Sequence, residues 1–256
     1  MTETVVTAGI IIIGNEVLSG RTQDLNLAFL ARALNEIGIR VAEARVIPDT
    51  QEAIVTAVNA CRARFAYVFT TGGIGPTHDD ITAASIAAAF GVPLRRNPDA
   101  VRLLERQYAA GDRNAARMRM ADVPEGALLI GNPVSGAPGF QLENVFVLPG
   151  VPRIMQAMFD GLRGRLVGGD LVLSRAVAAF TTEGSIATPL AGLQARHERV
   201  SIGSYPFVRG GRLGTSLVLR SSDAAALDHA TAEVMALIRS VGVEPIEEPA
   251  VEWICG

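Results

Sequence analysis

The first 90 residues repeat one pattern three times: a short apolar run is followed by a longer segment whose apolar positions recur at helical spacing. The apolar runs are rich in β-branched and aromatic residues, which is typical of strands buried on both faces. The runs cover residues 4–13, 39–47 and 65–70, and the helical segments cover residues 24–38, 51–64 and 83–90. A strand followed by a helix three times over predicts a parallel sheet with helices on both faces.

The pattern changes in residues 93–124, which are polar and rich in arginine. This stretch predicts helices that pack on the flank of the sheet or take part in a subunit contact. Residues 131–140 are crowded with glycine and proline and are expected to form a loop. The remaining elements predicted for this half are strands at 127–130 and 145–148 and a helix at 153–166.

A second unit follows Gly168-Gly169-Asp170, which is the best candidate for a linker. Its predicted elements are a strand at 171–180, a helix at 182–197, strands at 200–205 and 214–220, a helix at 223–240, and an edge strand or loose tail thereafter. The sequence therefore predicts an α/β protein with a mostly parallel sheet in residues 1–168. A smaller α/β domain of βαββα order is expected in residues 170–256.

Composition narrows the class of protein. Hydrophobic residues make up 49% of the 256 residues, and the formal net charge of −3 argues against binding nucleic acid through bulk charge. No apolar run approaches the roughly 18 residues of a membrane span, and the first residues lack the basic segment of a signal peptide. We therefore expect a cytoplasmic protein that binds neither membranes nor nucleic acid. Cys61 and Cys255 suggest no disulfide framework and no metal site.

All 23 basic residues are arginine. The absence of lysine excludes a Walker-A phosphate site, a Schiff base and a catalytic lysine. An anion site in this chain must therefore use arginine, backbone amides, helix N-termini or a metal ion.

Thr70–Thr82 is the stretch with the strongest functional signal, because a buried strand there enters a glycine-rich turn and leaves as a helix. Such turns bring backbone N–H groups close to a phosphate, although glycines are also used simply for tight turns. Asp79 and Asp80 stand at the predicted start of the helix, where they would either cap it or hold Mg²⁺ beside a phosphate. The helix dipole is expected to keep both carboxylates ionised.

Gly14-Asn15-Glu16 follows the first strand, at the same edge of the predicted sheet as the glycine-rich turn. Glu16 either closes a turn or reaches a metal ion or a ribose hydroxyl. Of the three histidines, His78 is the one placed to take part in chemistry. His197 and His229 fall on predicted helices and are interpreted as surface or packing positions.

Four segments together resemble the molybdopterin-binding family of MoaB/Mog type, and more closely the N-terminal part of the competence/damage-inducible protein A (CinA) family. These segments are residues 14–20, 70–82, 138–140 and 148–152. Residues 182–186 and 201–206 also look like the small α/β domain of CinA proteins. The resemblance spans roughly the whole chain, and it implies a three-layer Rossmann-like domain with its site at the carboxyl ends of the strands.

The resemblance also implies roles for individual residues. Asp80 matches the family's essential aspartate, and Glu16 matches an acidic residue after the first strand. The predicted catalytic residues are Asp80, Asp79, Glu16 and His78, of which Asp80, Asp79 and Glu16 would bind the metal ion. The predicted phosphate- or ligand-binding residues are Gly14, Asn15, Thr70, Thr71, Gly72, Gly73, Gly75, Pro76, Thr77, Pro149 and Gly150.

Two departures from the family pattern stand out. The first motif of the family usually reads Gly-Asp-Glu, and Asn15 replaces its aspartate, which removes a charge and is expected to reduce metal affinity or rate. Long CinA proteins also carry a C-terminal amidohydrolase domain, for which a chain ending at Gly256 has no room, so deamidase activity is not expected.

Three functions remain open at this point. The first is a pyrophosphatase that depends on Mg²⁺, Mn²⁺ or Co²⁺ and cleaves ADP-ribose-like or flavin dinucleotides. The second is binding or adenylylation of molybdopterin, and the third is a non-catalytic nucleotide-binding module. The expected partner is a nucleotide or pterin phosphate. Relatives imply a homo-oligomer, a dimer or trimer, with residues 113–120 as a candidate contact.

Overall fold

The computed structural model describes residues 4–248, so the expectations for Cys255 and for the end of the chain lie outside the described residues. The described residues divide into two compact units between Gly169 and Asp170. The first unit contains a six-stranded sheet of order β2-β1-β3-β8-β7-β6. Its strands are β1 (Val6–Ile13), β2 (Ile39–Ile47), β3 (Tyr67–Thr71), β6 (Leu128–Ile130), β7 (Gly139–Leu142) and β8 (Val145–Leu148).

The sheet is mostly parallel, as the sequence predicts. Strands β2, β1, β3 and β8 pair in parallel, whereas β7 and β6 are added antiparallel at one edge. Strand β7 was not predicted, because its four residues follow a loop rich in glycine and proline and give no periodicity. The parallel strands place the carboxyl ends of β1, β2, β3 and β8 at one edge of the sheet.

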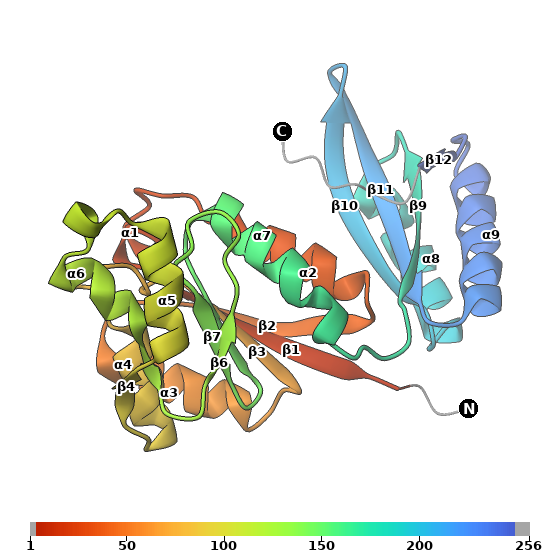
Figure 1. Ribbon diagram of the computed structural model, residues 1–256. Helices are drawn as coiled ribbons and strands as arrows, with labels where there is room; N and C mark the ends of the chain where they lie inside the picture. The colour runs from red at the N-terminus through yellow and green to blue at the C-terminus, as the bar shows by residue number, and fades with distance from the viewer. Residues whose placement is uncertain (1–3, 249–256) are drawn as a thin grey trace. The chain divides into compact units, whose positions relative to one another are not determined.

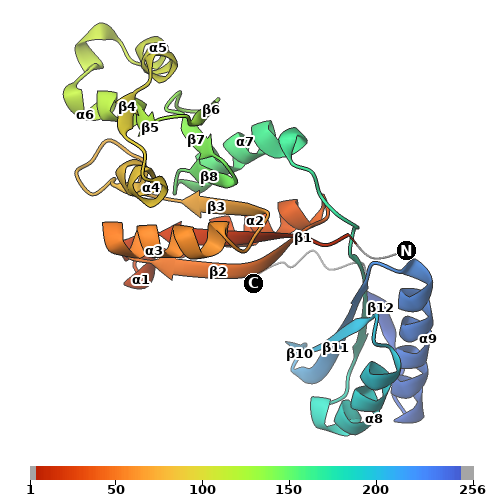
Figure 2. The ribbon, with the colours of Figure 1, turned by 90° about the horizontal axis from the view of Figure 1, so that it is seen from below.

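Helices cover both faces of this sheet and make a three-layer domain (Figure 1 and Figure 2). Side chains of β1 alternate between the layers: Ile10 and Ile12 pack toward α2 and α7, while Ile11 and Ile13 pack toward α3 and α4. This two-sided burial explains why the strand reads as a continuous apolar run. The covering helices are α2 (Asn26–Asn35), α3 (Gln51–Arg62), α4 (Thr82–Phe90) and α7 (Pro152–Leu162), and the short α1 (Asn15–Leu18) follows β1.

The arginine-rich stretch forms helices on the flank, as expected, together with a two-stranded sheet that the sequence pattern did not predict. The helices are α5 (Pro98–Gln107), α6 (Ala115–Met118) and the 3₁₀ turns Ala110–Asp112 and Arg119–Ala121, and a further 3₁₀ turn, Arg163–Arg165, follows α7. The added strands are β4 (Leu94–Arg96) and β5 (Asp122–Pro124). Three residues are too few for a strand to show alternation, so these strands escaped sequence analysis.

The second unit is a four-stranded antiparallel sheet of order β10-β11-β9-β12, with α8 and α9 packed on one face (Figure 1). Its elements are β9 (Leu173–Ala179), α8 (Glu183–Arg196), β10 (Ser201–Arg209), β11 (Arg212–Ser221), α9 (Ala224–Ser240) and β12 (Ile246–Glu248). Strand β12 pairs with β9, so the predicted edge strand exists. No helix among residues 4–248 has both the length and the apolar character needed to cross a membrane.

Candidate functional site

Three loops meet at the carboxyl edge of the large sheet, each following one of the neighbouring strands β1, β3 and β8. Residues from all three line one open cleft with a volume of about 550 Å³, within the range of small-molecule sites. Predicted site residues in its lining are Glu16, Gly72, Gly73, Gly75, Pro76, Asp80, Pro149 and Gly150. Segments more than 130 residues apart in the chain are thus brought to one site.

The turn after β3 requires glycine at two successive positions. Gly72 and Gly73 have φ of +104° and +66°, which residues with side chains rarely adopt. A Cβ on Gly72 would lie 2.2 Å from the carbonyl oxygen of Ile13, and one on Gly73 would lie 2.2 Å from Oγ1 of Thr82. These close approaches let the backbone itself form the wall of the cleft.

Hydrogen bonds fix this turn from both sides. Thr82, the first residue of α4, donates its hydroxyl to the carbonyl of Gly72 and its N–H to the carbonyl of Gly73, both at 3.0 Å. The N–H of Gly72 donates to the carbonyl of Leu148 in β8 at 3.1 Å, so it is already used in a hydrogen bond to the sheet. Among the described residues, the N–H groups of Gly73, Ile74 and Gly75 have no hydrogen-bond acceptor, which leaves them available to a ligand.

Asp80 both shapes the turn and lines the cleft. Its Oδ2 accepts the backbone N–H of Thr77 at 2.8 Å and lies 2.6 Å from the Thr77 hydroxyl. A Cβ on Gly75 would lie 2.6 Å from the same oxygen, so the carboxylate packs directly on the glycine turn. Oδ1 accepts no hydrogen bond within the described chain and remains free for a cation or a ligand.

Unlike Asp80, Asp79 and His78 are not among the residues that line the cleft. The Thr77 hydroxyl, 2.6 Å from Oδ1 of Asp79, holds the pKa of this carboxyl below its usual range. The largest cause is thus a side-chain hydrogen bond in the loop that precedes α4, which begins at Thr82. His78 lines an adjacent smaller cavity of about 240 Å³, which shares Asp80 with the cleft.

Glu16 is the second carboxylate in the cleft. Its side chain folds back over Gly14, where a Cβ would lie 2.6 Å from Oε1. Asn15 and Gly14 are not among the lining residues, and the N–H of Asn15 donates to Asp49 at 2.8 Å. The asparagine that replaces the family's aspartate therefore stands outside the cleft wall, next to another carboxylate.

Thr70 and Thr71, at the end of β3, are fully buried, and their hydroxyl oxygens have no hydrogen-bond partner in the described structure. Oδ1 of Asn26 is buried and unpartnered as well, while its amide group donates to the carbonyl of Gly150 at 2.8 Å. Thr71 and Asn26 line a small cavity of about 50 Å³ that also borders Glu16. Unpartnered polar atoms beside a cavity of this size suit an ordered water or a polar part of a ligand.

Several lining residues were missed by sequence reasoning. Thr22, Tyr108, Asn132 and Ser135 all face the cleft from loops or flanking helices. Asn132 organises its own loop: its Oδ1 accepts the N–H groups of Val134 and Ser135, and its amide donates to Ala137. The Asn-Pro-Val-Ser-Gly turn was visible in the sequence, but nothing in it indicated which site the turn approaches.

The charged side chains known to line the cleft are acidic. Among the described residues, its wall contains the carboxylates of Glu16 and Asp80 and no arginine or histidine. Arg119 lines the adjacent cavity, and its guanidinium donates to the carbonyl of Pro76 at 2.7 Å. A phosphate in the cleft would thus meet backbone amides and two carboxylates, an arrangement that needs a cation to be favourable.

Comparisons with known proteins agree with this architecture. The family described as "Probable molybdopterin binding domain" matches residues 9–166, and the family "FAD synthase, middle domain" matches residues 171–247. A protein of Aeropyrum pernix is 35% identical over 254 residues, which cover 93% of this chain and 94% of that protein.

Relatives named CinA or CinA-like are among the matches. A "CinA-like protein" of Syntrophus aciditrophicus is 36% identical over 216 residues, covering 77% of this chain and 50% of that protein. The crystal structure of the protein CinA, of unknown function, from Thermoplasma acidophilum has 33% identity and a TM-score of 0.60, covering 63% of this chain and 98% of that one. The chain spans about half the length of the CinA-like relative and about three fifths of two relatives from Pyrobaculum. The expected resemblance is confirmed.

Proposed function

The chain belongs to the molybdopterin-binding family of MoaB/Mog type, in its CinA-like branch, and on that premise we propose that it is a divalent-metal-dependent pyrophosphatase. Its substrate class is a dinucleotide-like diphosphate, such as an ADP-ribose-like compound or a flavin dinucleotide. Hydrolysis adds one water across the P–O–P bridge and releases two monophosphates. The cleft at the carboxyl ends of β1, β3 and β8 is the proposed site.

The observation that carries this proposal is the pairing of Glu16 and Asp80 with free backbone amides on a wall without cationic side chains. Two carboxylates alone would repel a diphosphate. Their oxygens are the ligands that Mg²⁺ prefers, and the free Oδ1 of Asp80 offers one directly. The donor set therefore fits a hard divalent cation, with Glu16 and Asp80 as the residues that would hold it.

When bound, such a cation withdraws charge from the phosphate oxygens and lowers the pKa of a nearby water. The chain's own residues supply position and shape. The N–H groups of Gly73, Ile74 and Gly75 are available to phosphate oxygens, and Thr77 holds Asp80 in place through Oδ2. Asp79 is kept ionised by the Thr77 hydroxyl and adds negative charge beside the site without lining it.

The match of residues 171–247 to the FAD synthase middle domain supports including flavin dinucleotides among the substrates. The family description supports an alternative ligand, a pterin phosphate, with adenylyl transfer from ATP in the same cleft. A third alternative, a non-catalytic nucleotide-binding module, is supported by Asn15, which removes a carboxylate from the first motif.

A panel assay distinguishes these functions. The protein is incubated with ADP-ribose, FAD, NAD or ATP and with Mg²⁺, Mn²⁺ or Co²⁺, and the products are identified by mass spectrometry. Pyrophosphatase activity yields two monophosphates from a dinucleotide. AMP transfer from ATP to a pterin phosphate added as acceptor would replace the proposal by the adenylyl-transfer alternative. Tight nucleotide binding without turnover would replace it by the non-catalytic alternative.

The variant Asp80→Asn is expected to lower turnover at least about 100-fold, because it removes a charged ligand of the proposed ion. Asp160→Asn, a change on the exposed face of α7, is the matched control and should leave turnover unchanged. Asp79→Asn distinguishes the contributions of the two neighbouring carboxylates to turnover. Because Asp79 does not line the cleft, this variant should lower turnover much less than Asp80→Asn. Unchanged turnover in Asp80→Asn would refute the proposed role of Asp80.

A further inference from the structure

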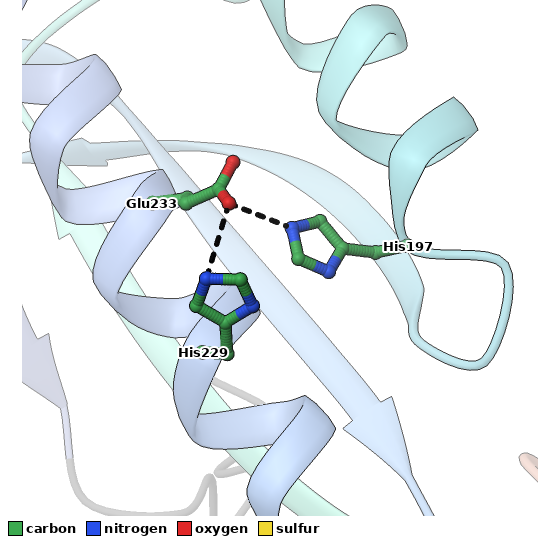
Figure 3. A group of neighbouring side chains, drawn as sticks. All are labelled: His197, His229 and Glu233. Atoms are coloured by element: carbon green, nitrogen blue, oxygen red, sulfur yellow. Dashed lines mark ion pairs between the residues drawn. The ribbon is translucent and has the colours of Figure 1, made fainter.

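Two histidines and a glutamate converge in the second unit, far along the chain from the cleft residues. Figure 3 shows His197, at the C-terminal end of α8, facing His229 and Glu233 on α9. Nε2 of each histidine lies 3.4 Å from Oε1 of Glu233. The potential ligand atoms of the three side chains all lie within 4.8 Å of one another. Both histidines were expected at surface or packing positions, and the structure brings them together with Glu233.

The fold builds this cluster from two elements. His229 and Glu233 are four residues apart on α9, which places them on one face of the helix. His197 ends α8, where its N–H donates to the carbonyl of Leu193 at 3.1 Å. The core residues Leu193 of α8 and Val234 of α9 belong to the same apolar cluster, so the two helices are packed against each other at this point.

His197 provides a second, independent indication of a ligand. Its side chain is only 9% exposed, and its buried Nε2 makes no hydrogen bond although it points at Glu233. A buried imidazole nitrogen without a well-formed hydrogen bond costs free energy unless a hydrogen-bonding group or a metal ion satisfies it. The buried Nε2 of His197, which lies 3.4 Å from the Glu233 carboxylate without a hydrogen bond, is therefore consistent with a ligand position for a metal ion.

The spacing of the three side chains also fits a metal ion. Zinc binds histidine nitrogen and carboxylate oxygen at about 2.0–2.2 Å, so two ligands of a tetrahedral site lie about 3.4 Å apart. Both Nε2–Oε1 separations are 3.4 Å. His229 is 70% exposed, so its ring can adjust to close the remaining distance to His197.

The surrounding charge also disfavours an ion-pair explanation. Arg196 already donates to Oε2 of Glu233 at 2.7 Å and is the main reason why the pKa of this carboxyl lies below its usual range. For ion pairs at Oε1 as well, both imidazoles would have to be protonated with their rings 5.3 Å apart. An imidazole nitrogen is also a common ligand of metal ions.

We propose that His197, His229 and Glu233 bind one divalent transition-metal ion of the zinc class, as a three-ligand site that joins the end of α8 to α9. Two imidazoles and one carboxylate suit zinc or a chemically similar ion rather than Mg²⁺ or Ca²⁺. Three protein ligands leave a fourth position open to water or to another ligand. The site is independent of the carboxylate cleft, which offers only oxygen ligands.

The test uses the full chain, purified without a histidine tag and stripped of metal with a chelator. Zinc affinity is measured by competition with a chromophoric chelator, and Co²⁺ is added to record the visible spectrum of the bound ion. The unaltered protein should bind one equivalent of zinc tightly, give the intense visible absorption of tetrahedral Co²⁺, and unfold at a higher temperature with zinc present.

The variants His229→Gln and Glu233→Gln should each lower zinc affinity at least about 10-fold and abolish the tetrahedral Co²⁺ spectrum. His229 is exposed, so its replacement should leave the apo protein folded, which circular dichroism checks. Arg196→Gln is the matched control: it removes the ion pair with Glu233 but keeps all three ligands, so zinc binding should persist. Asp80→Asn should also retain it.

Absence of tight zinc binding in the unaltered protein would overturn the proposal. So would equal affinity in His229→Gln, or a loss of the Co²⁺ spectrum in Asp80→Asn with the spectrum intact in His229→Gln. The last result would place the ion in the cleft. Because the readouts are affinity, spectrum and unfolding temperature, this test is independent of whether the pyrophosphatase activity exists.

Discussion

At the scale of single residues, the Asp80 side chain both holds the turn and lines the cleft. Asp80 fixes the turn through Oδ2, while Oδ1 accepts no hydrogen bond from the described residues, so replacement by alanine would confound loss of the proposed metal ligand with loss of the turn. Asparagine keeps an acceptor for the Thr77 N–H and removes the charge. The sequence singled out Asp80 because its position after the glycine turn is local information, and the structure places Asp80 in the cleft wall. The sequence did not reveal that Asp79 is not among the lining residues.

Gly72→Ala is expected to lower the free energy of unfolding by more than the strain of its positive φ alone would. The added methyl would lie 2.2 Å from the carbonyl oxygen of Ile13, so β1 and the turn must separate. Gly91→Ala is the matched control, since Gly91 also has positive φ, +66°, but open space around its Cβ position. Strain from the left-handed conformation alone should cost about 1–2 kcal/mol at Gly91.

Urea unfolding of both variants measures the difference. Gly72→Ala should lose more unfolding free energy than Gly91→Ala and should also lose nucleotide affinity, whereas Gly91→Ala should keep it. Equal destabilisation with ligand binding preserved in both would show that the close approach to Ile13 is dispensable.

At the scale of elements, the sequence predicted best where a strand or helix is long and regular. The limits of β2 and β8 were predicted to the residue, because apolar runs there end at Pro48 and Pro149. Strands β4, β5 and β7 were missed because they are short and lie among arginine, glycine and proline. The start of α4 was predicted to within one residue, at 83 against Thr82, but Asp79 and Asp80 do not cap the helix: the Thr77 hydroxyl donates to both carboxylates in the preceding loop.

Helix α9 begins at a titratable cap. Oδ1 of Asp223 accepts the N–H groups of Ala225 and Ala226 at 3.0 and 3.1 Å, and the bond from Ala226 is the main cause that lowers the pKa of this carboxyl. A carboxyl whose folded pKa is depressed stabilises the fold above its unfolded pKa, near 4, and loses that contribution as pH falls through the lower folded value.

We therefore expect Asp223→Ala to lower the unfolding temperature at pH 7 and to differ less from the unaltered protein near pH 3. Asp223→Asn keeps a capping oxygen without the charge and should fall between the two at pH 7. Thermal unfolding followed by circular dichroism provides the comparison. If the difference in unfolding temperature between Asp223→Ala and the unaltered protein were the same at pH 7 and pH 3, a charged cap would be excluded.

At the scale of the whole molecule, the cleft joins loops that are distant in the chain, and this limited what the sequence predicted. The loop at Gly14–Glu16 and the glycine-rich turn after β3 were expected to meet, because the carboxyl ends of parallel strands lie at the same edge of a sheet. Tyr108 and Asn132 lie in segments whose path depends on packing of the flank and on the antiparallel β7. No local pattern records that packing, so these residues appear only once the fold is known.

The first unit contains both apolar clusters that sandwich the large sheet and every residue that lines the cleft. A fragment of residues 1–169 is therefore expected to unfold cooperatively and to retain Asp80-dependent turnover. Calorimetry and the product assay test this expectation. A folded but inactive fragment would assign a substrate-binding role to the second unit.

The central claim is that the cleft hydrolyses a phosphoanhydride with the help of a divalent ion and Asp80. The most direct measurement is turnover of ADP-ribose in ¹⁸O-labelled water with Mg²⁺, Mn²⁺ or Co²⁺, followed by mass spectrometry of the products. The account predicts AMP and a ribose phosphate, one labelled oxygen per bond cleaved, and loss of turnover on chelation and in Asp80→Asn. Turnover that persists after chelation and in Asp80→Asn would contradict it.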